Sequence, residues 1–268
     1  ARALRPRLGR GARGEPRGPE LAPEGRGVSE EEDFGLKLNN GNMSETNPSI
    51  SIVVPFYNVE SCIDYCMESL LCQTYDNYQI ICVDDGSIDL TGALLDSYET
   101  NEKVIVRHKQ NGGLSDARNY GLSMSEGSYV TFVDGDDIVS PRYLERLVEV
   151  AVLHPDLLVA GSFINVPFKK ALSNRVIWPN NKTSYELWNI DESIEAFLYN
   201  KVTESAWGKL APIEAYKECE FPVGRLYEDL STFPSLLLQF KGIAYLHNAD
   251  YGYVIRDGSI INSRKPSL

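Results

Sequence analysis

The sequence has no long apolar run, and this absence limits the class of protein that it can encode. No stretch approaches the ~20 consecutive apolar residues that a helix needs to cross a bilayer, so we expect no transmembrane segment. The Arg-rich start lacks the apolar core of a signal peptide. We therefore expect a cytoplasmic protein, with peripheral contact at the inner face of the membrane left open.

Cysteines arranged in pairs are also missing. The chain has five cysteines, an odd number, and none of them forms a Cys-x-x-Cys pair. This usage fits a reduced protein in which most cysteines are small buried side chains. It does not favour a disulfide framework or a metal site built on cysteine.

Basic charge is scarce, because 26 Lys and Arg residues face 38 Asp and Glu residues and the net charge is −12. Nucleic acid is therefore not expected as the main partner, since binding a phosphate backbone needs a basic face. A phosphate ligand bridged by a divalent metal ion remains compatible, because the ion supplies the positive charge.

Glycine-rich phosphate loops are absent as well. The first predicted strand is not followed by Gly-x-Gly-x-x-Gly, and no Gly-x-x-x-x-Gly-Lys-Ser/Thr loop occurs. The three histidines are scattered, without a Ser or Cys signature of a hydrolase triad. A dinucleotide-binding enzyme, a P-loop nucleotidase and a triad hydrolase are all disfavoured.

Strands and helices are expected to alternate from residue 50 onward. The pattern predicts strands at 50–56, 78–83, 104–107, 129–133 and 157–164, with helices between them. Such alternation is typical of an α/β protein with a mostly parallel sheet, and the apolar first strand suits burial on both faces. Further along, we expect an irregular stretch or hairpin at 168–184, helices at 190–199 and 230–240, and extended structure at 243–255.

Residues 1–48 are predicted to be a disordered extension, because Arg, Gly and Pro dominate it and few large apolar residues occur. An extension foreign to the natural chain, which would then start at Met43, is one explanation. At the other end the chain stops soon after Ile261, so we expect the C-terminal part to be truncated.

Three carboxylates, Asp134, Asp136 and Asp137, directly follow the strand predicted at 129–133. In an open α/β sheet, ligands bind outside the carboxyl ends of the strands. Adjacent acids repel one another unless a cation lies between them, and Mg²⁺ or Mn²⁺ is the natural candidate. The alternative is an acidic turn in which Gly135 is the bend and Asp137 caps the next helix.

Two further pairs of acids are candidates for a site. Asp84 and Asp85 end the strand at 78–83, where Asp85 can accept hydrogen bonds from a nucleobase or ribose. The alternative for this pair is a turn with a helix cap. Glu228 and Asp229 open the helix predicted near 230, where acids also favour a helix N-terminus without any further role.

Four segments occur together in a characteristic order: 52–60 (IVVPFYNVE), 83–89 (VDDGSID), 111–121 (NGGLSDARNYG) and 132–137 (FVDGDD). Two shorter segments follow, 227–229 (YED) and 256–260 (RDGSI). With these segments the chain resembles the family 2 glycosyltransferases of bacterial polysaccharide biosynthesis, which are inverting enzymes of the GT-A fold that use nucleotide sugars. The resemblance extends from about residue 50 to 263.

The resemblance implies a role for each matching residue. Residues 49–160 would form the nucleotide-sugar-binding half of the domain and 161–268 the acceptor-side half. Asp229 would be the catalytic base, and Asp134 and Asp136 would hold a divalent cation, Mn²⁺ or Mg²⁺. The residues expected to bind the nucleotide sugar are Pro55, Tyr57, Glu60, Asp85, Asn111, Gly112, Asp134 and Arg256.

The expected activity is inverting transfer of a hexose or N-acetylhexosamine from a UDP-sugar to a hydroxyl of a glycan or lipid-linked saccharide. A sugar nucleotidyltransferase is one alternative, although residues 56–59 (FYNV) replace its usual Gly-rich, Arg-containing loop. A catalytically inactive binding module of the same fold is the other. The family often has Tyr-Arg where this chain has Ala211 and Pro212, and Pro where it has Asp257, which leaves the acceptor open.

Overall fold

The computed structural model of the chain describes residues 47–178 and 181–256. All of them belong to one unit of the chain, residues 41–268. The extension predicted at 1–48 lies almost wholly outside the described residues, as do the predicted turn at Gly258 and the end of the chain. The predicted boundary between the two halves falls inside a strand, so both halves share one sheet.

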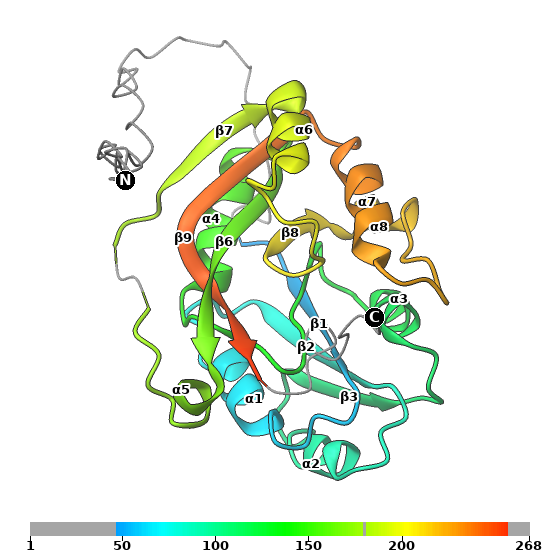
Figure 1. Ribbon diagram of the computed structural model, residues 1–268. Helices are drawn as coiled ribbons and strands as arrows, with labels where there is room; N and C mark the ends of the chain where they lie inside the picture. The colour runs from blue at the N-terminus through cyan, green and yellow to red at the C-terminus, as the bar shows by residue number, and fades with distance from the viewer. Residues whose placement is uncertain (1–46, 179–180, 257–268) are drawn as a thin grey trace, which may run out of the picture. The chain divides into compact units, whose positions relative to one another are not determined.

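In the described part of the chain, nine strands form a sheet in the order β3-β2-β1-β4-β8-β6-β9-β5, with β7 paired to β9 (Figure 1). Four parallel neighbours come first: β1 (Ile50–Phe56), β2 (Tyr78–Asp84), β3 (Val104–His108) and β4 (Tyr129–Phe132). Strand β8 (Lys209–Pro212) runs antiparallel to β4 and to β6 (Leu158–Pro167). Strand β9 (Gly242–Ile255) is parallel to β6 and antiparallel to β5 (Ile138–Val139) and β7 (Tyr185–Asn189).

Helices cover both faces of this sheet. One face packs against α1 (Ile63–Leu71) and α4 (Tyr143–Leu153), and the other packs against α3 (Leu114–Ser123) and α8 (Glu228–Leu237). The other helices are α2 (Thr91–Asp96), α5 (Phe168–Leu172), α6 (Ile190–Leu198) and α7 (Ile213–Lys217). Among residues 47–178 and 181–256, no helix is both long and apolar enough to cross a membrane.

The sequence of strand β1 explains why helices cover both faces of the sheet. Ile52 and Val54 belong to the core cluster on one face, and Val53 belongs to the cluster on the other. Successive side chains of a strand point to opposite faces, so a continuous apolar run must be buried twice. The predicted α/β class and the predicted burial of this strand are both confirmed.

Some local predictions are wrong. The stretch 168–184 begins with helix α5 rather than a hairpin. Asp137 does not cap the next helix, because the N-cap of α4 is Arg142, which makes no side-chain cap bond. The pattern also fails to reveal β5, β7, β8 and α7, which have five residues or fewer and are therefore too short for a clear periodic signal.

The carboxyl ends of β1, β2 and β4 lie at one edge of the sheet, and their loops bind one another there. The backbone N–H of Asn58, after β1, donates to Ser87 Oγ at 3.0 Å. The N–H of Ile88, after β2, donates to Asn58 Oδ1 at 2.9 Å. Asn58 has φ of 51°, a left-handed conformation that asparagine tolerates better than most residues.

His108 ties the end of β3 to two other elements. Its Nδ1 lies 2.9 Å from Asp84 Oδ2 on β2, and its Nε2 lies 2.8 Å from Asp96 Oδ1 on α2. A carboxylate only accepts hydrogen bonds, so both contacts form fully only when both ring nitrogens carry protons. The bond to Asp84 raises the pKa of His108, and the bond to Asp96 adds to this.

We expect this contact to stabilise the protein at acidic pH and to be lost on the alkaline side. Because the folded-state pKa of His108 is raised, the stabilisation is complete below the ordinary pKa of about 6.5 and disappears as pH rises through the raised value. The imidazole is 46% exposed, so the loss should stay below about 1 kcal/mol. Urea unfolding at pH 6 and pH 9 measures this change in the free energy of unfolding. In His108→Gln the change between the two pH values should be smaller than in the wild type. An equal change in wild type and variant would contradict the assignment.

Candidate active site

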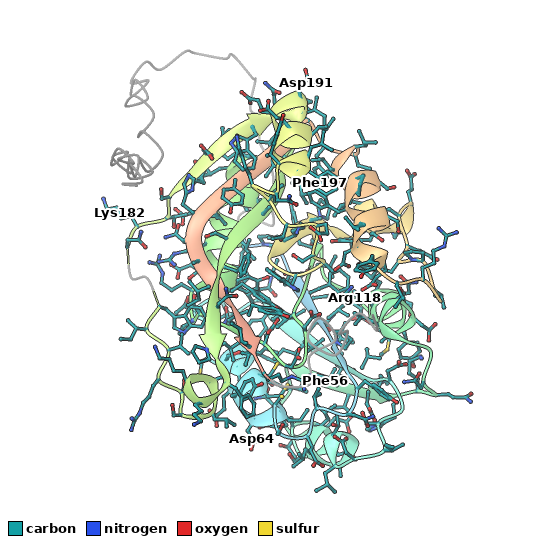
Figure 2. All side chains as sticks on the ribbon, viewed as in Figure 1. Phe56, Asp64, Arg118, Lys182, Asp191 and Phe197 are labelled. Carbon is teal, nitrogen blue, oxygen red and sulfur yellow. The ribbon has the colours of Figure 1, made fainter. Side chains whose placement is uncertain are left out.

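The acidic turn after β4 packs against the end of β1, and this contact requires glycine at position 135. A Cβ on Gly135 would lie 2.4 Å from the Phe56 ring and 2.8 Å from the carbonyl oxygen of Pro55. Figure 2 labels Phe56 at the end of β1. The turn brings Asp134 and Asp136 to the edge of the sheet, where their side chains are 24% and 27% exposed.

Asp137 is buried and anchors this turn to β9. Its Oδ1 accepts from the backbone N–H of Val254 at 2.7 Å, and its Oδ2 accepts from the Tyr251 hydroxyl at 2.6 Å. The same hydroxyl accepts from the N–H of Asp134 at 3.2 Å. Burial, reinforced by the neighbouring acids, raises the pKa of Asp137 well above its usual range. Asp137 is therefore a structural anchor of the turn.

One buried arginine connects the acidic turn to the other candidate acids. Arg118, labelled in Figure 2, extends from α3 and is 1% exposed. Its Nη1 donates to Glu228 Oε1 at 3.0 Å and to Asp229 Oδ1 at 2.7 Å. Its Nη2 donates to Asp134 Oδ1 at 3.0 Å. The predicted base and a predicted metal ligand thus bind to the two ends of one guanidinium.

The backbone conformation directly before α8 helps to place Glu228 and Asp229. Tyr227 has φ of 59° and ψ of 44°, the left-handed conformation, although it carries a large side chain. Such a residue is uncommon and costs roughly 1–2 kcal/mol. The helix starts directly after it, so that Glu228 and Asp229 occupy the first turn and reach Arg118.

Asp229 has the electrostatic character of a weak base near neutral pH. Burial raises the pKa of Asp229 to about 6. The positive charge of Arg118 acts against this shift, and the negative charge of Asp134 acts with it. A group with this pKa is mostly charged at neutral pH and still basic enough to accept a proton.

A buried lysine lies on the other side of Asp229. Burial lowers the pKa of Lys209 to about 7, and its Nζ donates to the carbonyl oxygen of Ser205 at 2.5 Å. Lys209 and Asp229 line a cavity of about 10 Å³ together with Phe233. This is room for a single water molecule at most.

A second cluster forms where Asp85, directly after β2, meets the loop that follows β3. Its Oδ1 accepts from Lys109 Nζ at 2.7 Å and from the N–H of Gly112 at 2.9 Å, and its Oδ2 accepts from the N–H of Gly113 at 2.8 Å. Asn111 Nδ2 donates to the backbone oxygen of Asp85 at 2.9 Å. Three of the predicted nucleotide-binding residues therefore meet, and the side chain of Asp85 already accepts three hydrogen bonds.

The other predicted residues lie around the same edge. Pro55 is buried in β1, and Tyr57 is 50% exposed just after it. Glu60 Oε2 accepts from the N–H of Leu90, which joins the loops after β1 and β2. Arg256 lies at the end of β9 and pairs with Asp136. Helix α3 connects the two clusters, since it starts beside Asp85 and carries Arg118 one turn later.

The donor atoms of Asp134 and Asp136 fit a divalent ion that is shared with a ligand. Asp134 binds Arg118 through Oδ1 and Asp136 binds Arg256 through Oδ2, so in each carboxylate the arginine takes only one of the two oxygens. Residues 47–178 and 181–256 contain no group of three His, Cys, Asp or Glu that can hold an ion by itself. Mg²⁺ is commonly held by one or two carboxylates with substrate phosphates and water completing its shell, and this arrangement matches that pattern.

Several residues that shape the site were not among the predicted site residues. They are two buried or half-buried lysines, one arginine and one tyrosine: Lys109, Lys209, Arg118 and Tyr251. A lysine or arginine that will be buried looks the same in the sequence as an exposed one. Two signals were available: Arg118 lies inside the motif at 111–121, and the excess of acids near strand ends favours counter-charges from elsewhere in the fold.

Residues 51–214 match the family model described as Glycosyl transferase family 2. Glycosyltransferase GlyA of Streptococcus pneumoniae serotype 4 is 33% identical over 218 residues, which are 79% of this chain and 31% of GlyA. Glycosyltransferase GlyG of the same organism is 31% identical over 221 residues, 80% of this chain and 73% of GlyG.

Among solved structures, residues 1–349 of TarS from S. aureus, in complex with UDP-GlcNAc, match with a TM-score of 0.67 at 24% identity. The match covers 81% of this chain and 62% of the TarS chain. The shared architecture confirms the predicted GT-A-like fold. The chain spans less than a third of GlyA and under two thirds of this part of TarS.

We expect Arg118→Met to lower the free energy of unfolding by roughly 3–5 kcal/mol at pH 8, because three poorly solvated carboxylates lose their shared counter-charge. The loss should shrink towards pH 5, because Asp229, whose pKa is raised to about 6, takes up a proton there. Urea unfolding at both pH values tests this. Arg142→Met is the matched control, since Arg142 binds the exposed Glu145 and should cost less than about 1 kcal/mol. Equal losses in the two variants would contradict a central role for Arg118.

Proposed function

The chain belongs to glycosyl transferase family 2, and on that premise we propose that it transfers a sugar from a nucleotide-sugar donor to a hydroxyl group of a glycan or lipid-linked saccharide. We propose inversion at the anomeric carbon and UDP as the nucleotide. The observation that carries this proposal is the shared guanidinium of Arg118, which holds Asp229 and Asp134 at one edge of the sheet. A base and an acid that holds the divalent cation at the diphosphate are both needed there.

Asp229 is the proposed catalytic base. An acceptor hydroxyl must lose its proton as it attacks the anomeric carbon, and a carboxylate in reach contributes roughly 10²–10⁴ in rate. Its pKa of about 6 suits this task better than that of an ordinary aspartate. The hydrogen bond from Arg118 fixes Oδ1 and leaves Oδ2 to face the acceptor.

Asp134 and Asp136 are proposed to hold the divalent cation at the donor diphosphate. When bound, the ion stabilises the negative charge that develops on the leaving nucleoside diphosphate. The complex of TarS with UDP-GlcNAc supports a UDP-sugar as donor, because TarS shares the fold. Separate acids for metal and base avoid a conflict, since a carboxylate bound to a metal ion is a poor base.

Six residues are proposed to surround the nucleobase and ribose: Asp85, Pro55, Tyr57, Glu60, Asn111 and Gly112. The support is their position at one edge, where the loops after β1, β2 and β3 bind one another. Asp85 orders this wall through three accepted hydrogen bonds, and the remaining lone pairs of its carboxylate are available to a base N–H.

Calorimetric titration should show that UDP binds in the presence of Mn²⁺, more strongly than GDP or dTDP. Asp136→Ala should lose the dependence on metal, whereas Asp85→Asn should weaken UDP binding about tenfold and keep that dependence, because a hydrogen bond to a charged group contributes on the order of 1.5–3 kcal/mol. Metal-dependent binding of another nucleotide would show that the donor carries a nucleobase other than uracil. Absence of any nucleotide binding would contradict the proposal.

Turnover by the wild-type protein should decline below about pH 6, as Asp229 takes up a proton and can no longer act as a base. Asp229→Asn should lower turnover by roughly 10²–10⁴ and leave UDP binding intact. The assay is release of UDP from UDP-glucose and UDP-N-acetylglucosamine with water as acceptor. Glu228→Gln is the control, because Glu228 binds the same nitrogen of Arg118; an equal loss in both variants would overturn the base assignment.

A further inference from the structure

Arg256 is held beside the acidic turn by strand β9, which ends at the residue before it. Strand β9 is paired with β6 as far as Ile255, and the N–H of Val254 donates to Asp137 Oδ1 at 2.7 Å. The Tyr251 hydroxyl, on the same strand, donates to the other oxygen of Asp137. Asp137 therefore fixes the strand, and Arg256 follows two residues after its anchor point.

Arg256 pairs with the neighbouring acid of the same turn. Its Nε lies 2.8 Å and its Nη2 2.7 Å from Asp136 Oδ2, so two N–H groups bind a single carboxylate oxygen. The two side chains are 22% and 27% exposed, which leaves both within reach of a ligand from solvent. The positive charge of Arg256 thus lies at a carboxylate assigned to a divalent cation.

Arg118 and Arg256 differ in their exposure to solvent, although each binds an acid of this turn. Arg118 is 1% exposed and binds three carboxylates, so its position is determined from several sides. The bond of Arg256 to Asp136 lies at the end of a strand and is partly exposed. Because Arg256 is the more exposed of these two arginines, it can exchange Asp136 for a ligand without disrupting the core.

A nucleoside diphosphate offers Arg256 an alternative partner. Guanidinium groups bind phosphate as well as carboxylate, through the same planar set of N–H donors. A divalent cation on Asp136 repels the guanidinium from that carboxylate and attracts the diphosphate to the same place. Binding of the cation to Asp136 therefore favours binding of the diphosphate to Arg256, and binding of the diphosphate to Arg256 favours binding of the cation to Asp136.

We propose that Arg256 is an exchangeable counter-ion, which pairs with Asp136 in the empty site and moves to the donor diphosphate when a divalent cation takes the carboxylate. The proposal rests on the proposed function, since it takes the same diphosphate and cation. It adds that metal and nucleotide bind cooperatively and that Arg256 carries this coupling. Arg256 competes with the metal when no nucleotide is present and assists the nucleotide when the metal is bound.

The test measures two equilibria in the full chain: binding of Mn²⁺ alone, and binding of UDP at saturating Mn²⁺. In Arg256→Gln, Mn²⁺ alone should bind roughly fivefold more tightly, because its competitor for Asp136 is gone. UDP with Mn²⁺ should bind about tenfold more weakly, because a charge-assisted contact to phosphate is lost. Arg256→Lys, which keeps the charge without the planar fork, should lie between wild type and Arg256→Gln in both measurements.

Arg107→Gln is the matched control. Arg107 lies on β3 and forms an exposed ion pair with Glu99, so removing its positive charge should change neither equilibrium. Opposite changes in the two affinities of Arg256→Gln support the exchange. If both affinities fall, or if Mn²⁺ binding does not change, Arg256 is a fixed structural partner and the exchange is wrong. If wild-type protein binds neither UDP nor GDP with Mn²⁺, the proposed function itself fails.

Discussion

The contact on which the candidate site depends is the binding of three carboxylates to the buried guanidinium of Arg118. Asp134 comes from the turn after β4, while Glu228 and Asp229 come from the first turn of α8, about a hundred residues later. Left alone, these acids would repel one another and could not remain poorly solvated together. The arginine neutralises part of their charge and sets the distance between the two functional parts of the site.

A second connection joins the two halves of the sheet through β9. The ring of Tyr251 stacks on Trp207 with centroids 4.2 Å apart, and its hydroxyl binds Asp137. Trp207 lies two residues before β8, in the second half of the domain, whereas Asp137 belongs to the acidic turn of the first half. The orientation of that turn therefore depends on residues that follow it by more than a hundred positions.

Several acids lie close together in a partly buried site, which destabilises their charged forms. The same destabilisation makes the carboxylates more reactive towards protons and cations. Burial raises the pKa of Asp229 to about 6 and raises the pKa of Asp136 as well, so neither carboxylate is as stable in its charged form as it would be in water. Tyr227 adds backbone strain next to the proposed base. Such features concentrate at functional sites, and a cation that enters relieves the repulsion between the acids.

Local periodicity and the residues that end a strand are enough to predict strands β1 to β4, the burial of β1 on both faces and the acidic turns at Asp85 and Asp134–Asp137. The order of the motifs also indicated the family. The role of each acid, in contrast, depends on tertiary contacts. Asp137 is an anchor rather than a helix cap because β9 returns to it, and Arg118 and Lys209 flank Asp229 because α3 and β8 pack against α8 from distant parts of the chain. Contacts of this kind depend on how remote segments pair, and no pattern of neighbouring residues encodes that pairing.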